Sequence, residues 1–112
     1  MIINTLISVV SWEERFLKGF IDDIDRYKPK KVILICHDEL TDLKEYNLKE
    51  AEKYARRKRI NISIVNVPEN AIERWKILKN FFMFEFRFSY KTLIDITTMR
   101  RETIWTLLSF LT

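Results

Sequence analysis

Four apolar runs rich in β-branched residues alternate with four amphipathic stretches along the whole chain. The runs cover residues 2–10, 31–36, 60–67 and 92–96. Strand patterns separated by helical patterns are typical of a mostly parallel sheet that carries helices on its faces. Residues 32–35 are apolar without a break, which suits a strand buried on both sides. The sequence therefore predicts an α/β fold, specifically a Rossmann-like three-layer sandwich.

The length of the chain and the rules for strand connections narrow this prediction. A chain of 112 residues forms one domain, here residues 1–112, with one sheet. Right-handed crossovers put the first strand in the centre, the second and third strands on one side, and the fourth on the other. We therefore predict the strand order 3-2-1-4, in which the turns after the first and fourth strands lie next to each other.

Polar residues mark the predicted starts of three helices. Ser11 and Glu14 fit a capping box, and Asn47 and Asn70 each stand three residues before a Glu. Pro29 is a stop signal for the first helix. Apolar residues at helical spacing predict the core-facing sides of two of these helices. They are Trp12, Phe16, Phe20, Ile24 and Tyr27 in the first helix, and Ile72, Trp75, Leu78 and Phe82 in the third.

Residues 81–88 carry more aromatic surface than one face of a helix can bury. Phe84, Phe86 and Phe88 alternate as in a strand, so either the third helix continues or a fifth strand begins. The last helix adds an apolar tail at residues 107–111. A surplus of this kind predicts an interface with a partner, and we expect a homodimer.

The composition excludes several functions. Cys36 and His37 are the single residues of their kinds, so an internal disulfide and a Cys/His zinc site are excluded and no metal is expected. Because Gly19 is the one glycine, neither a dinucleotide fingerprint nor a Walker loop exists, and no cofactor is expected. No stretch approaches the roughly 20 apolar residues of a membrane helix, and the first residues lack the basic start of a signal peptide. We expect a cytoplasmic protein with no membrane partner.

The net charge of +4 results from 20 basic and 16 acidic residues that are largely intermixed. The densest basic run, residues 56–59, reads as the solvated end of a helix, where cations complement the carbonyl groups. The alternative is a nucleic-acid patch, although no interleaved Gly or aromatic residue accompanies the run. A nucleic-acid partner therefore stays an open alternative.

The most functional-looking segment is the predicted strand, hydroxyl-rich turn and helix start at residues 93–102. It sets two Thr hydroxyls, free backbone N–H groups and two Arg side chains where an anion can bind. In the plainer reading, Thr97 or Thr98 is an ordinary helix cap and the Arg residues are only exposed. Asp95 either accepts N–H bonds in the turn or acts as an acid or base, and the turn role is favoured.

The predicted strand order brings this turn next to the turn after the first strand. Two helix N-termini then converge on one crevice and offer backbone donors and partial positive charge to a phosphate. The residues expected to line the crevice are Ser11, Trp12, Arg15, Thr97, Thr98, Met99, Arg100 and Arg101.

Residues 36–39 offer a second candidate chemistry at the end of the second strand. His37 has the chemistry of a general base and Cys36 that of a nucleophile. Adjacent strand residues point to opposite faces, so the two side chains do not form a dyad. His37 and Asp95 are therefore separate candidate catalytic residues, and for His37 a structural role is favoured.

The turn at residues 95–100, Asp-Ile-Thr-Thr-Met-Arg, resembles that of the CARF domains, the Rossmann-like ligand sensors of CRISPR-associated proteins. Those domains usually carry an Asp/Asn-x-Thr-Gly-Gly-Thr-like turn at this place, and residues 9–13 match their first strand-to-helix turn. The resemblance implies a role in antiviral defence and a homodimer that binds cyclic oligoadenylate across its two-fold axis. Candidate contacts on this basis are Ser11, Thr97, Thr98 and Arg100. Such domains normally add further strands, so residues 1–112 are either a minimal version or a part of one.

Three hypotheses follow. The first is a dimeric nucleotide-binding module that senses a second messenger. The second is an enzyme that cleaves a phosphodiester, with His37 or Asp95 assisting and the Arg pair stabilising charge. The third is a non-catalytic oligomerisation or interaction module, in which the aromatic tract and the apolar tail dock a partner.

Overall fold

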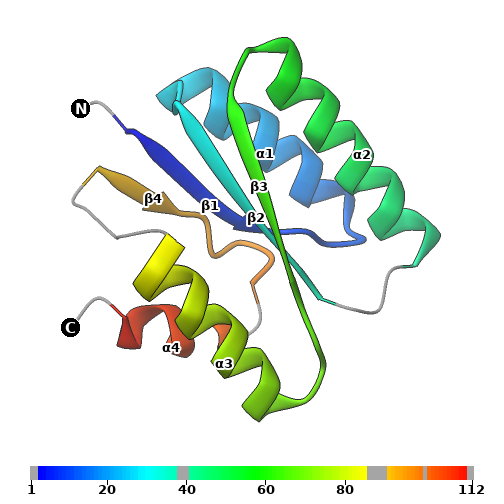
Figure 1. Ribbon diagram of the computed structural model, residues 1–112. Coiled ribbons are helices and arrows are strands. Elements are labelled where there is room, and N and C mark those ends of the chain that lie inside the picture. The colour runs from blue at the N-terminus through cyan, green and yellow to red at the C-terminus, as the bar shows by residue number, and fades with distance from the viewer. Residues whose placement is uncertain (1–2, 38–40, 86–90, 100, 111–112) are drawn as a thin grey trace.

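A computed structural model describes residues 3–37, 41–85, 91–99 and 101–110. Strands and helices alternate along these residues (Figure 1). The strands are β1 (Thr5–Val9), β2 (Lys31–His37), β3 (Asn61–Val67) and β4 (Thr92–Ile94). The helices are α1 (Glu14–Tyr27), α2 (Asp42–Arg57), α3 (Ala71–Asn80) and α4 (Arg101–Ser109), with a π-helical turn, Phe81–Glu85, after α3.

The strands form one parallel sheet in the order β3-β2-β1-β4, which confirms the predicted fold class and strand order. Ile7 of β1 pairs with Ile33 of β2 on one side and with Ile94 of β4 on the other. The uninterrupted apolar run of β2 is fully buried, as a central strand with helices on both faces requires.

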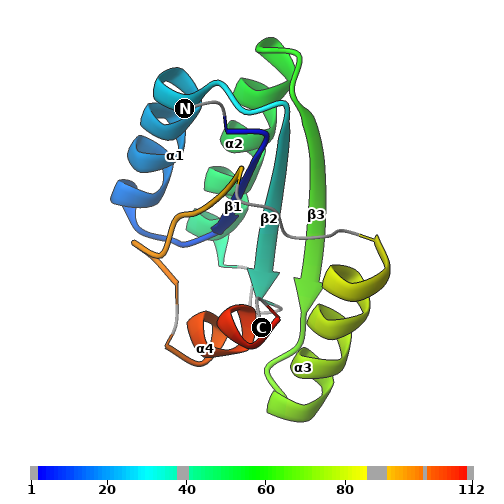
Figure 2. The same cartoon turned by 90° about the vertical axis from the view of Figure 1, so that its left-hand side faces the viewer.

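Helices cover the two faces of the sheet in pairs, α1 and α2 on one face and α3 and α4 on the other (Figure 2). Successive residues of β2 serve opposite faces, since Leu34 packs toward α1 and α2 whereas Ile33 and Ile35 pack toward α3 and α4. Two apolar clusters separated by one sheet therefore form the core.

Two of the predicted helix caps are wrong. α1 begins at Glu14 with Glu13 at its cap position, and Ser11 instead accepts a hydrogen bond from the N–H of Glu13 (3.1 Å). The reason is that Val10 still pairs with β2 through its N–H, so the chain leaves the sheet later than the capping pattern assumed. Asn47 lies inside α2, which begins at Asp42 behind the cap residue Thr41. The other cap predictions concern α3 and the end of α1.

Asn70 caps α3 as predicted, accepting from the N–H groups of Ile72 and Glu73 at 3.0 and 3.1 Å. α1 ends at Tyr27, just before Pro29, which confirms the predicted stop. The basic run at residues 56–59 is exposed at the end of α2, as a solvated helix end is.

The predicted apolar stripes are correct in their centres and wrong at their ends. Phe16, Phe20 and Ile24 are buried in α1, but Trp12 precedes the helix and is 57% exposed. In α3 the buried face follows Arg74, Leu78 and Phe82 at intervals of four, which turns Ile72 and Trp75 away from the sheet. Those exposed side chains belong to the surface and not to the core.

The aromatic tract continues α3 with a π-helical turn, Phe81–Glu85, so the helical alternative holds as far as residue 85. Phe82 stacks on Phe110 with 6.0 Å between ring centroids and meets Phe81 edge-on at 5.0 Å. Part of the aromatic surplus is thus covered within the chain. Phe86 and Phe88, where a fifth strand was the alternative, lie outside the described residues. Among the described residues no helix has the length and apolarity needed to cross a membrane.

Candidate functional site

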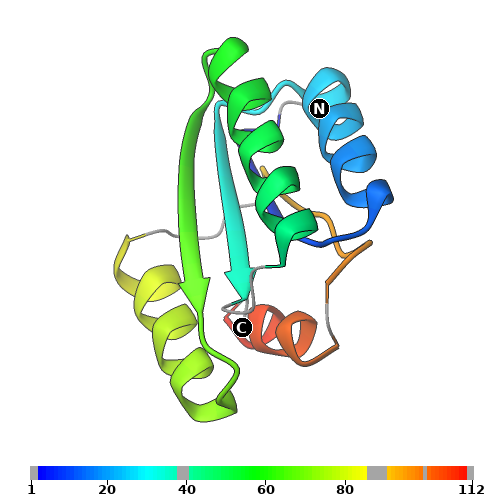
Figure 3. The same cartoon turned by 90° about the vertical axis from the view of Figure 1, so that its right-hand side faces the viewer.

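The turns after β1 and β4 lie side by side at the carboxyl edge of the sheet (Figure 3). The Thr98 hydroxyl donates a hydrogen bond to the carbonyl of Val9 (3.0 Å), two residues before Ser11. The N–H of Asp95 continues the β1–β4 ladder by donating to Ile7 (2.9 Å). The structure thus brings together the two segments that the strand order was expected to join.

The turn at residues 95–99 is held by its own polar groups. Asp95 Oδ1 accepts a hydrogen bond from the N–H of Thr97 (2.9 Å), which is the turn role favoured from the sequence. The N–H of Met99 donates to Ile96 (3.1 Å), and the Met99 side chain is buried in the cluster under α3 and α4. Thr97 is exposed and Thr98 is half-buried. The Thr97 side chain therefore faces outward, whereas the Thr98 hydroxyl bonds to β1 and Met99 anchors the inner side of the turn.

The structure describes one of the two arginines of this turn. Arg101 is the first residue of α4, is exposed, and forms no ion pair with a residue that the structure describes. Arg100 lies outside the described residues.

The turn after β1 is fixed from α2. Ser11 is buried, and its carbonyl accepts a hydrogen bond from Asn47 Nδ2 at 2.7 Å. The same Nδ2 atom donates to the carbonyl of Glu13 at 3.1 Å. Asn47 is therefore a buried clamp between α2 and the start of α1, a role that the sequence analysis missed. A buried-facing Asn in the middle of an amphipathic helix was the available signal.

Trp12 and Arg15 lie on the outer side of this turn. Arg15 is exposed and ion-paired with Glu13, so its guanidinium already has a partner. Trp12 borders a cavity of about 410 Å³ between the first turns of α1 and α2. Leu17, Leu43 and Tyr46 provide much of the apolar lining of this cavity.

Lys44 is a buried residue of α2 that the sequence analysis did not single out. It is buried at the start of α2, with 9% of the residue exposed. Lys44 lies one helical turn before Asn47 and on the same face of α2, the face that packs on the sheet. It is the one buried lysine among the described residues, and it forms no ion pair with any of them.

Asp95 lies beside Asp23 of α1, and both residues border a cavity of about 270 Å³ next to β4. Burial, the hydrogen bond to Asp95 and the nearby charges of Asp95 and Asp22 raise the pKa of Asp23 to about 7. Burial also opposes ionisation of Asp95, but hydrogen bonds from Asp23 and Thr97 outweigh it and lower the pKa of Asp95. Below about pH 7 the pair therefore holds one proton, and it loses this proton as the pH rises through the pKa of Asp23.

His37 and Cys36 are both buried and lie at the end of β2. Cys36 belongs to the cluster under α1 and α2, so His37 points toward the opposite face and the two form no dyad. The Cys36 thiol instead donates a long hydrogen bond to the His37 carbonyl (3.8 Å). Asp95 contacts α1, so His37 and Asp95 lie on opposite faces of the sheet and do not act as one acid–base pair.

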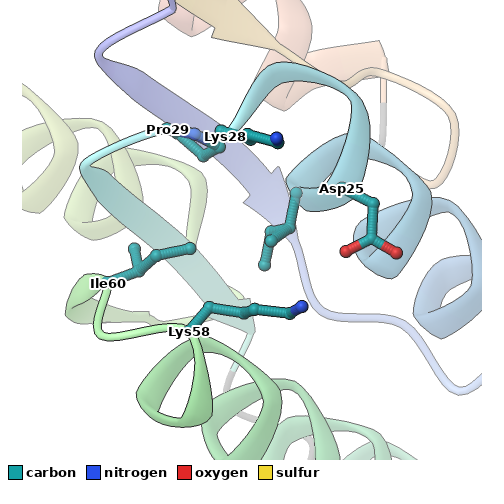
Figure 4. Close-up of a pocket in the computed structure, with 6 residues that line it drawn as sticks. Asp25, Lys28, Pro29, Lys58 and Ile60 are labelled. Carbon is teal, nitrogen blue, oxygen red and sulfur yellow. The ribbon is translucent and has the colours of Figure 1, made fainter.

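A cavity of about 460 Å³ lies at the opposite edge of the sheet, where α1 and α2 end (Figure 4). Lys28 and Lys58 stand on its rim, and Asp25 accepts a hydrogen bond from the Tyr54 hydroxyl. Ligands of open α/β sheets bind beyond the carboxyl ends of the strands, where this cavity does not lie. The carboxyl edge is therefore the better candidate site.

Comparisons of the chain with protein families, with curated proteins and with solved structures found no match.

Proposed function

We propose that the chain is a cytoplasmic ligand-sensing module of the CARF type, which binds the phosphates of a cyclic oligoadenylate at the carboxyl edge of its sheet. The observation that supports the proposal most is the hydrogen bond from Thr98 to the carbonyl of Val9. It ties the turn that precedes α4 to the strand that precedes α1, so two helix starts flank one place. Helix starts offer unpaired N–H groups and partial positive charge, which suit a phosphate.

The residues of the site take distinct roles in this proposal. The Thr97 hydroxyl donates to a phosphate oxygen, the Thr98 hydroxyl holds the turn through its bond to the Val9 carbonyl, and Arg101 and Arg100 provide charge-assisted hydrogen bonds. Ser11 is buried with its hydroxyl already accepting from Glu13, so it shapes the turn and contributes its proton to the ligand side. A second copy of the chain completes the site across a two-fold axis, as the resemblance implies.

Calorimetric titration of the purified protein with cyclic tetra-adenylate tests the proposal, with linear tetra-adenylate as the comparison ligand. The double variant R100A/R101A is expected to bind at least about tenfold more weakly, because charged hydrogen bonds to phosphate are lost. The matched control is R57A, which removes an exposed arginine from the far end of α2. Native mass spectrometry of the same samples reports the subunit count. Equal affinity of R100A/R101A and the unmodified protein would discard this site.

A second candidate function, phosphodiester cleavage, is favoured by the carboxyl pair of Asp23 and Asp95. A pair that holds one proton near neutral pH can give or take a proton during a reaction. Incubation with labelled cyclic tetra-adenylate separates cleavage from binding alone. Product formation that disappears in D95N, while the protein stays folded, would favour the enzyme over the sensor.

A further inference from the structure

Basic side chains gather at the amino edge of the sheet, where the parallel strands begin. Lys28 and Lys30 lie in the turn from α1 to β2. Lys58 and Arg59 lie in the turn from α2 to β3, and all four residues are exposed. The two turns are neighbours, because β2 pairs with β3 and the Lys30 carbonyl accepts a hydrogen bond from the N–H of Asn61 (3.1 Å). Two segments that are far apart in the sequence therefore form one cationic surface, which we call the basic edge.

The acidic residues that flank the basic edge on α1 and α2 have other partners. Asp22 and Glu52 each form an ion pair with an Arg one turn further along their own helix, at 3.5 and 3.2 Å. Asp25 accepts a hydrogen bond from the Tyr54 hydroxyl, and Asp23 lies beside Asp95. The four cations of the basic edge form no ion pair with a residue that the structure describes. The net charge of this surface is therefore positive, which suits an anionic partner.

Two residues of the basic edge have a left-handed backbone conformation. Lys28, the cap residue at the end of α1, has a φ of 48°, and Arg59, just beyond α2, has a φ of 60°. Among the described residues these are the two with positive φ. Gly or Asn usually occupies such positions at helix ends, because a larger side chain crowds the backbone there. Long cationic side chains at both positions indicate that their charge has a use.

The cavity of about 460 Å³ lies between the two turns of the basic edge. Lys28 and Lys58 stand on opposite sides of it (Figure 4). Ile24, Pro29 and Ile60 add apolar surface to its lining, and all three are buried. An apolar floor between two cationic sides fits a flat base whose flanking phosphates meet the cations.

We propose that the basic edge binds single-stranded nucleic acid, with phosphates at Lys28, Lys58 and Arg59 and one base in the cavity. This inference is independent of the function proposed for the carboxyl edge. A membrane or a protein partner is disfavoured, because none of the large exposed apolar side chains of the described residues lies in residues 24–31 or 54–61. Membrane surfaces and protein interfaces use such side chains as anchors, whereas nucleic acid is bound chiefly through phosphate charge. A duplex keeps its bases stacked and offers none to the cavity.

The variant K28N/R59N tests the inference, because Asn removes each charge and tolerates the left-handed conformation. The probe is a fluorescein-labelled oligo(U) strand of about ten nucleotides, followed by fluorescence anisotropy at several salt concentrations. K28N/R59N is expected to bind about tenfold more weakly, and its log–log salt slope should be smaller by about 1.4, since each phosphate contact of a single strand contributes about 0.7. The charge-preserving variant K28R/R59K should bind like the unmodified protein. Unchanged affinity and slope in K28N/R59N would overturn the inference.

The matched control is K49Q/K76Q, which removes the same charge from two other helices. Lys49 and Lys76 are exposed and ion-paired with Glu45 (3.3 Å) and Glu73 (3.9 Å). K49Q/K76Q should bind the strand like the unmodified protein. A loss as large as that of K28N/R59N would show a general effect of net charge and overturn the inference, as would a loss in K28R/R59K.

Two further measurements test the alternatives. Cations also stabilise helix ends, but K28N/R59N is expected to unfold at or above the urea midpoint of the unmodified protein, since Asn relieves the backbone. A lower midpoint with unchanged RNA binding would show that Lys28 and Arg59 serve only the helix ends. An abasic strand should bind about fivefold more weakly than oligo(U), and equal binding or a preference for a duplex would overturn the single-strand assignment. Sedimentation with phosphatidylserine vesicles that K28N/R59N abolishes, without any RNA binding, would identify a membrane as the partner instead.

Discussion

The Asp23–Asp95 pair makes a quantitative prediction for the variant D23N. The folded chain holds a proton on Asp23 up to a pKa of about 7, whereas an unfolded chain releases it near 3.8. Between these pH values the folded state therefore binds more protons than the unfolded state. Because of this, Asp23 lowers the unfolding free energy progressively as the pH rises from about 4 to 7. Asn cannot ionise, and its Nδ2 group is able to donate to Asp95 as the protonated carboxyl does. D23N should therefore lack this loss of stability.

The size of the effect follows from the shift. For a fully enclosed group, the difference between a pKa of about 7 in the folded state and 3.8 in the unfolded state corresponds to about 4 kcal/mol of unfolding free energy. Asp23 is half-buried, so solvent screens its charge, and about 1–2 kcal/mol is the expected effect. The unfolding free energy of D23N minus that of the unmodified protein should therefore be about 1–2 kcal/mol larger at pH 8 than at pH 5.

Urea unfolding at pH 5, 6, 7 and 8, followed by fluorescence of the three Trp residues, measures this difference. Every other group that titrates in the range contributes equally to both proteins and cancels. D22N is the matched control, since Asp22 is exposed on the same helix and ion-paired with Arg26 (3.5 Å), and less than half of the effect is expected there. A D23N advantage of the same size at pH 5 and pH 8 would refute the assignment of the shared proton to Asp23.

Three further substitutions test the packing of the site and the core. The Thr103 hydroxyl is fully buried and has no hydrogen-bond partner in the described part of the chain. T103V should therefore raise the unfolding free energy by about 1 kcal/mol, and a lower value in urea unfolding would reveal a partner. N47A should lower the unfolding free energy by about 2 kcal/mol, because the carbonyls of Ser11 and Glu13 lose their donor. The turn at residues 11–13 should also show faster amide hydrogen exchange, and unchanged exchange would contradict the role of Asn47 as a clamp. L78A removes a buried side chain and should lower the unfolding free energy in urea by about 2–5 kcal/mol. I72A removes an exposed side chain and should lower it by less than about 0.5 kcal/mol, so similar losses for the two variants would contradict the orientation of α3.

The fold was predictable from the sequence because its signals are local and repeated. Each strand of the sheet is an apolar run of the right length, and the rule of right-handed crossovers fixes the order once the strands are known. The buried face of α1 was legible from the spacing of Phe16, Phe20 and Ile24. The caps were harder, since the capping pattern of Ser11 and Glu14 ignores that Val10 still pairs with β2.

The candidate site was predictable only in its backbone. The strand order implied that the turns near Ser11 and Thr98 meet, and the hydrogen bond from Thr98 to Val9 follows from that order. The side chains that complete the site depend on where the helices cross the sheet. Asn47 reaches a carbonyl 36 residues away, and a local pattern carries no information about such a contact. Asp23 and Asp95 pair across helix and strand for the same reason.

Two polar groups near the carboxyl edge of the sheet weaken the fold, and their shared location favours a function there. Thr103, in the first turn of α4, buries a hydroxyl that has no hydrogen-bond partner among the described residues. Burial, together with the neighbouring Asp95, raises the pKa of Asp23 to about 7. Unfavourable choices that are scattered at random would not gather at the one edge where parallel sheets bind ligands. An edge that holds only structural side chains would instead carry an apolar residue at position 103, since it would pack better.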